Sequence, residues 1–177
     1  GQVNEKTDKQ LVSDLYAIIG DIYSSKELSD KAYAAYDSSL VYNPDNIGTL
    51  NNYAYFLSVD RKHLDKAEEM SYRTVKAEPE NATYLDTYAW ILFEKGKYTE
   101  ARIYIDQALK NGGDSSQVIV EHGGDIYYMV GDRDKALEYW KKADAMGSTP
   151  EDGSTPRTPE ELKRLKRKIA LKKYIAE

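Results

Sequence analysis

The chain has 177 residues and a formal net charge of −5, with 31% charged and 41% hydrophobic residues. This balance, with 16 Tyr and only 5 Pro, favours a helical soluble protein over an intrinsically disordered one. The absence of Cys excludes disulfides, thiolate nucleophiles and thiolate metal sites. No apolar run approaches the length needed to span a bilayer, and no signal peptide is recognisable.

Residues 1–12 are expected to be an N-terminal lead-in that begins at a tag-removal scar or at a cut within a longer protein. After it, successive segments share a period of about 34 residues. These segments are residues 13–46, 47–81, 82–115 and 117–148. Each contains two stretches with amphipathic spacing, which predicts a helix, a tight turn and a second helix.

The third segment shows this spacing most clearly. Apolar residues recur at i, i+3, i+4 and i+7 in its first half and at similar spacing in its second half; they are Leu85, Tyr88, Ala89, Leu92, Ala101, Ile105 and Ala108. Gly96 lies between the halves, where a turn benefits from a residue that tolerates positive φ. One such hairpin cannot enclose a core, so its apolar faces require similar neighbours.

Small and bulky residues recur at fixed positions of the segments. The eighth and twentieth positions are small, as at Gly20 and Ala32, which lets two helices approach closely. The eleventh and twenty-fourth positions are bulky, as at Tyr23 and Tyr36, and Pro44 ends the second helix. This pattern resembles the tetratricopeptide repeat (TPR) family over residues 13–148.

The resemblance implies an all-α, right-handed solenoid of four helical hairpins with a C-terminal capping helix. Residues 64–92 are similar to the C-terminal part of longer bacterial TPR proteins. Some of those proteins are exported, so the cell envelope, the periplasm and the cytoplasm all stay open as compartments.

Residues 149–158 are rich in Gly, Pro, Ser and Thr and are predicted to be a linker, and residues 159–177 are predicted to be a basic helix. Thr158 is its expected N-cap and Pro159 its first residue. Residues from Arg157 onward carry a net charge of +5, which leaves −10 for the rest of the chain. The helix is expected to cap the last repeat with its basic face outward; binding to nucleic acid or to an acidic membrane is an alternative.

Motifs for catalysis and cofactors are missing from the sequence. It has no Walker-type loop, dinucleotide fingerprint, HExxH motif or nucleophile elbow. His63 and His122 lack the neighbouring ligands that a metal site needs. We therefore expect no metal, no other cofactor and no small-molecule substrate. An enzyme is the weaker alternative, because scattered carboxylates need a closed pocket to act as an acid/base pair.

In the TPR family, the first helix of each repeat lines a concave groove with its second, fifth, ninth and twelfth positions. The resemblance therefore predicts groove residues that are largely acidic or aromatic: Asp21, Asn51, Tyr55, Asp86, Trp90, Phe93, Glu121, Asp125 and Tyr128. A clamp for a C-terminal carboxylate is not expected, since the second positions are Asp14, Gly48, Thr83 and Val118.

We therefore predict a non-catalytic scaffold for protein–protein interactions, whose groove suits a peptide or protein segment bearing Lys or Arg. In a simpler interpretation, Trp90 and Phe93 only pack against neighbouring helices and the carboxylates are a solvated face. Two further alternatives are self-association, with the basic helix of one copy in the acidic groove of another, and a structural segment of a longer array. An apolar face on the helix before Ser13 would support the longer array.

Overall fold

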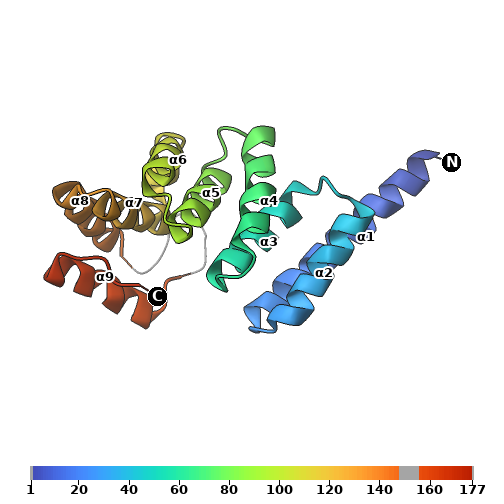
Figure 1. Ribbon diagram of the computed structural model, residues 1–177. Helices are drawn as coiled ribbons and strands as arrows, with labels where there is room; N and C mark the ends of the chain where they lie inside the picture. Colours follow the sequence, from blue (N-terminus) through green and yellow to red (C-terminus); the bar gives the residue numbers. More distant parts are fainter. Residues whose placement is uncertain (1, 148–155, 177) are drawn as a thin grey trace. The chain divides into compact units, whose positions relative to one another are not determined.

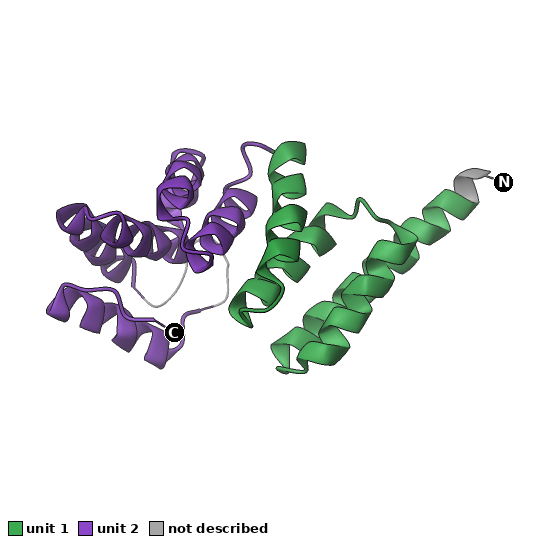
Figure 2. Cartoon of the chain, in the orientation of Figure 1, with its two compact units in different colours: residues 1–78 green, residues 79–177 purple. Residues whose placement is uncertain are grey.

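The structure is a computed structural model that describes residues 2–147 and 156–176, with side chains from residue 5 onward. Within these ranges the chain is all-α, and Figure 1 shows its helices arranged as successive hairpins. The chain divides into two compact units, residues 1–78 (unit 1) and residues 79–177 (unit 2), which are coloured separately in Figure 2. No helix of the described ranges combines the length and the apolar character that a membrane crossing requires.

Unit 1 contains two hairpins. Their helices are α1 (Gln2–Ser25), α2 (Ser29–Tyr42), α3 (Ile47–Val59) and α4 (Leu64–Ala77). Because α1 begins at Gln2, residues 2–12, which we expected to be a lead-in, continue the first helix of the array. Two aromatic rings lie in the core of this unit: Tyr36 stacks on Tyr53, with centroids 5.3 Å apart, and also contacts Phe56.

Unit 2 contains two further hairpins and the C-terminal helix. Its helices are α5 (Ala82–Glu94), α6 (Tyr98–Lys110), α7 (Gln117–Met129), α8 (Arg133–Ala145) and α9 (Pro159–Leu171), with a short 3₁₀ turn at Gly113–Ser115. Gly96 lies in the turn between α5 and α6 with φ 77°, as predicted. The backbone there turns back sharply, since the N–H of Lys97 donates to the carbonyl of Leu92 at 2.9 Å.

The first helices of the second, third and fourth hairpins start with the same local device. The side chains of Asn46, Asn81 and Ser116 accept a hydrogen bond from the backbone N–H three residues later. Each bond satisfies one of the donors that a helix start leaves unpaired. The repeat period is therefore visible in the caps as well as in the core.

Close packing between the helices of a hairpin explains the small residue at the eighth position. A Cβ added to Gly20 would lie 2.6 Å from the Tyr36 ring, and one added to Gly124 would lie 2.4 Å from the Trp140 ring. Only glycine fits at such distances. The predicted roles of the eighth and twenty-fourth positions are thus confirmed in the first and fourth hairpins.

Helix α9 begins as predicted. Thr158 and Glu161 form a capping box, and Pro159 is the first helical residue. The helix ends at Leu171 rather than at residue 177, because Lys172 adopts the left-handed conformation with φ 52°. Residues 172–176 therefore continue in a new direction. Residues 149–155 of the predicted linker lie outside the described residues.

Candidate functional site

Helix α7 directs two carboxylates toward α9. Glu121 and Asp125 are four residues apart and so share one helix face, and their side chains are buried. Lys168 of α9 lies between them, with its Nζ 2.7 Å from Glu121 Oε1 and 2.9 Å from Asp125 Oδ1. Only 3% of Lys168 is exposed. A buried ammonium group therefore bridges two buried carboxylates.

Arg157, just before α9, completes the charged part of this site. Its Nη2 lies 2.6 Å from Glu121 Oε2, so each carboxylate oxygen of Glu121 binds a different cation. The indole Nε1 of Trp140 donates to Asp125 Oδ1 at 2.9 Å. Both buried carboxylates are thus held by donors from outside α7, as burial of a charge requires.

These neighbours set the protonation of the two carboxylates. Burial acts to raise the pKa of Glu121, but Lys168 and Arg157 together outweigh it and hold that pKa below its usual value. For Asp125 burial dominates, so its pKa is raised to about 6 in spite of Lys168. Burial alone would lower the pKa of Lys168, yet the two carboxylates keep it above its usual value. Glu121 and Lys168 are therefore both charged at neutral pH.

An aromatic stack lies beside the charged groups. The indole ring of Trp90 on α5 stacks on Phe93, with centroids 4.5 Å apart, and on the imidazole of His122 at 4.0 Å. His122 Nδ1 lies 2.7 Å from Asp86 Oδ1. Burial acts to lower the pKa of His122, but Asp86 outweighs it, and the net effect is a raised pKa. The imidazole of His122 therefore lies between the Trp90 ring and the carboxylate of Asp86 as part of the site.

The chain returns to this stack after α9. The ring of Tyr174 meets Phe93 edge-on, with centroids 5.3 Å apart, and Lys168 Nζ lies 5.4 Å from the centre of the Tyr174 ring. We call residues 156–176 the C-terminal segment. We call the surface that it contacts on α5 and α7 the α5–α7 face, made up of Asp86, Trp90, Phe93, Glu121, His122 and Asp125.

The predicted groove residues of unit 2 divide into two groups. Asp86, Trp90, Phe93, Glu121 and Asp125 come together in the α5–α7 face. Tyr128 lies apart from this face: its ring packs against Trp140, and the guanidinium of Arg133 lies 5.2 Å from its centre.

The predicted groove residues of unit 1 have different surroundings. Asp21 is exposed, and its Oδ1 accepts hydrogen bonds from Tyr36 at 2.6 Å and from Asn52 at 3.1 Å. Asn51 is buried, and its Oδ1 has no hydrogen-bond partner among the described residues. Tyr55 is 41% exposed and lies edge-on to Phe56.

His122 was not among the predicted groove residues, yet it belongs to the site through its contacts with Asp86 and Trp90. The repeat register could have indicated this position, because it places the first helices of the third and fourth hairpins, α5 and α7, next to each other. The expected outward orientation of the basic face of α9 is wrong for Lys168. Since Leu165, Lys168 and Ile169 share i, i+3, i+4 spacing, the lysine lies on the helix face that packs inward.

Comparisons with known proteins agree with the repeat pattern, although no family model matches the chain. A TPR repeat-containing protein of Pseudomonas aeruginosa is 29% identical over 104 residues, which are 58% of this chain and 18% of that protein. The structure of PilW, a type IV pilus biogenesis factor, is similar with a TM-score of 0.74 and 17% identity, over 90% of this chain and 70% of that one. The chain therefore has the fold of tetratricopeptide repeat proteins.

The TPR protein YrrB, described as having an unusual peptide-binding site, is also similar, with a TM-score of 0.60 and 18% identity over 74% of this chain and 66% of that one. The chain spans less than a fifth of the length of its curated relative from Pseudomonas aeruginosa. Among its described residues, no group of His, Asp and Glu side chains could hold a metal ion.

Proposed function

We propose that this TPR protein is a non-catalytic scaffold that binds a basic protein segment on the α5–α7 face. The observation that carries the proposal is that this face already binds basic and aromatic side chains, those of Lys168, Arg157 and Tyr174. A surface that holds one such segment has the charge and shape to hold another.

Electrostatics supports a cationic ligand. Glu121 is ionised at neutral pH, and the pKa of Asp125 at about 6 keeps that group largely ionised there as well. The neighbouring aromatic rings of Trp90 and Phe93 add contacts for an aromatic or aliphatic side chain of the ligand. The carboxylates of the α5–α7 face are engaged in ion pairs, which favours binding of a cation over proton transfer. Asp21, Asn51, Tyr55 and Tyr128 stay proposed members of the groove.

The similar proteins support a protein ligand rather than a small molecule. YrrB is described as a TPR protein with a peptide-binding site, and PilW as a factor in pilus biogenesis. Helical repeats commonly present extended surfaces to protein partners. We infer the same class of partner for this chain.

Peptide binding tests this proposal. Two pools of short fluorescent peptides, one with Lys, Arg and Tyr and one with Asp, Glu and Tyr, are titrated with the chain and followed by fluorescence anisotropy. The basic pool should bind more tightly, and the double variant Glu121→Gln, Asp125→Asn should weaken its binding by about tenfold or more, as expected for lost charge-assisted contacts.

The matched control is the double variant Glu100→Gln, Glu138→Gln, which removes the same charge from exposed positions on α6 and α8. It should bind the basic pool like the unaltered chain. Equal binding of both pools, or an equal loss in the control, would contradict the proposal.

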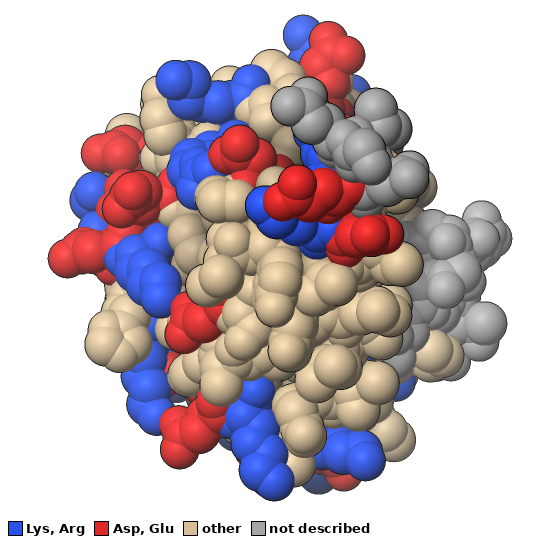
Figure 3. Space-filling model, turned by 90° about the vertical axis from the view of Figure 1, so that its right-hand side faces the viewer, with Lys and Arg blue, Asp and Glu red and all other residues tan. Residues whose placement is uncertain are grey.

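A second candidate function is a structural segment of a longer array. Helix α1 exposes apolar side chains at i, i+4, i+7 and i+11, with exposed fractions of 48% to 56%: Leu11, Leu15, Ile18 and Ile22. Figure 3 shows a broad area without charged side chains on the side where α1 lies. In a longer array, a preceding hairpin would cover this face.

The coding sequence upstream of the codon for residue 1 tests this candidate function. A further helical hairpin with apolar positions at the repeat spacing is expected there. A start codon directly before residue 1 would rule it out.

A further inference from the structure

We propose that the C-terminal segment is an intramolecular ligand of the α5–α7 face, which a protein partner must displace by presenting a basic and an aromatic side chain of its own. This inference rests on the proposed function, and it adds both the regulation of the face and the chemistry of the partner.

The segment contacts the face at separate points along its length. Arg157 binds Glu121 before the helix, Lys168 binds Glu121 and Asp125 from within it, and Tyr174 contacts Phe93 after it. A simple helical cap needs only an apolar stripe against the last hairpin. The charged and aromatic contacts on α5 and α7 are those of a bound ligand.

Packing indicates that the segment can leave. Helix α9 packs chiefly on α8, and less extensively than the two helices of each hairpin pack on each other. Its fully buried apolar anchor is Leu165, whereas most of its other side chains are exposed or half-buried. Arg157 Nη1 is buried and has no hydrogen-bond partner among the described residues, so its release lets water satisfy that donor.

The ion pairs also favour exchange. When the segment leaves, Lys168, Glu121 and Asp125 all return to water, so the energy of the lost pairs is offset by hydration. A partner cation that enters between the carboxylates repeats the same contacts. The partner is therefore expected to place a Lys or Arg between Glu121 and Asp125 and an aromatic ring against Phe93.

Covalent attachment gives the segment an advantage over any partner. Residues 148–155 tether it to α8, and short tethers produce effective concentrations on the order of millimolar. A partner in solution must compete with this concentration. The apparent affinity of the partner is therefore its intrinsic affinity multiplied by the fraction of chains whose face is open.

Peptide competition on the full chain tests the proposal. The probe is a fluorescein-labelled peptide of residues 156–176, followed by anisotropy. In the variant Lys168→Met the buried charge is lost but the α5–α7 face is unchanged, so this variant should bind the probe about tenfold more tightly than the unaltered chain. The matched control Lys163→Met removes an exposed lysine from the same helix and should bind like the unaltered chain.

Tyr174→Ala is the second variant, because its side chain lies beyond α9. It should also increase probe binding, by a smaller factor. Circular dichroism and tryptophan fluorescence monitor the fold, since both tryptophans, Trp90 and Trp140, belong to unit 2. Unchanged probe binding in folded Lys168→Met, or loss of the fold of unit 2 in both variants, would overturn the inference.

The outcomes also separate this inference from the proposed function. If the basic peptide pool binds but Lys168→Met does not increase probe binding, the segment is a structural cap and the scaffold function stands. If Lys168→Met binds the probe equally well with and without the added changes Glu121→Gln and Asp125→Asn, binding occurs elsewhere and both proposals are wrong.

Discussion

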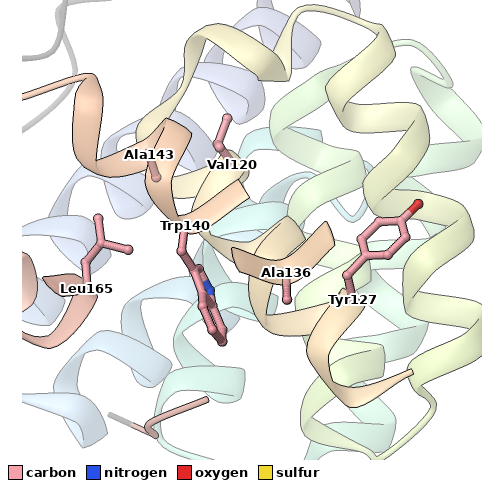
Figure 4. Packing of buried hydrophobic residues seen from close by; sticks show 6 residues of the cluster. All are labelled: Val120, Tyr127, Ala136, Trp140, Ala143 and Leu165. Carbon is pink, nitrogen blue, oxygen red and sulfur yellow. The ribbon is translucent and has the colours of Figure 1, made fainter. Parts of the chain in front are cut away.

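Helix α1 of unit 1 and helix α8 of unit 2 both carry an apolar face, but these faces have different surroundings. On α8, Trp140 and Ala143 are buried, and Figure 4 shows Leu165 of α9 lying next to them. On α1, about half of the surface of Leu15 and Ile18 is exposed. The difference shows what a cap accomplishes: one added helix buries an apolar face and also brings Lys168 to the carboxylates of α7.

The buried polar groups of the two units differ in kind as well. In unit 1 they include hydroxyls that bond to one another, such as Ser13 to Ser39 at 3.0 Å and Ser39 to Thr49 at 2.8 Å. In unit 2 they include the charged groups Glu121, Asp125 and Lys168. Hydroxyl groups do not titrate near neutral pH, whereas carboxylates respond to pH. We therefore expect the pH response of the molecule to come chiefly from unit 2.

The largest expected effect is that of truncating the apolar anchor of α9. Leu165→Ala removes a fully buried side chain packed against Trp140 and should lower the free energy of unfolding of unit 2 by about 3 kcal/mol. The matched change in unit 1, Ile18→Ala, removes a half-exposed side chain and should cost no more than about 1 kcal/mol.

Urea unfolding measures both changes, with tryptophan fluorescence for unit 2 and circular dichroism for the whole chain. Equal losses for the two variants would mean that the face of α1 is covered in solution. The comparison between the two faces would then fail.

A smaller effect is expected from neighbouring glycines of α7. Gly124→Ala places a Cβ 2.4 Å from the Trp140 ring and should destabilise unit 2 by about 2 kcal/mol through overpacking. Gly123→Ala is the control, because its Cβ would lie 3.4 Å from Leu109, an ordinary contact. It should stabilise the helix by up to about 1 kcal/mol. Thermal unfolding followed by tryptophan fluorescence compares the two, and equal shifts would contradict the close approach of α7 and α8.

A further difference between the two units concerns pH. Burial raises the pKa of Asp125 from 3.8 to about 6, so the folded chain binds this proton more tightly than the unfolded chain. The free energy of unfolding should therefore fall as pH rises from about 4 to about 6, by at most about 1.4 kcal/mol per pH unit. The variant Asp125→Asn should remove this slope in urea unfolding measured across the range.

Other charged groups around Asp125 act in different windows. Because the pKa of His122 is raised in the folded chain, its contribution to the free energy of unfolding is fully present below the unfolded pKa of 6.5. This contribution is lost as pH rises through the folded pKa. Because the pKa of Glu121 is lowered in the folded chain, its stabilising contribution is fully present above the unfolded pKa of 4.5. This contribution is lost as pH falls through the folded pKa. His122→Gln should therefore change the slope above pH 6.5, and because His122 acts to lower the pKa of Asp125, it should also move the Asp125 window to higher pH. If the free energy of unfolding of Asp125→Asn still fell between about pH 4 and about pH 6, a group other than Asp125 would bind the proton.

The all-α repeat fold was predictable from the residues, because its signals are local. The 34-residue period, the pairing of Gly124 with Trp140 and the N-cap of α9 at Thr158 all depend on neighbours within one hairpin or one helical turn. The acidic and aromatic character of the α5–α7 face follows from the same register. Periodicity shows which residues share a face of their own helix, so these features needed no coordinates.

The occupant of that face could not be derived in the same way. Lys168 and Glu121 lie far apart in the sequence, and no periodic pattern connects them. Whether α9 directs its charges toward water or toward α7 depends on how Leu165 packs against α8 and where Lys172 ends the helix. Burial of a charge depends on which partners surround it in three dimensions, and those partners come from separate helices.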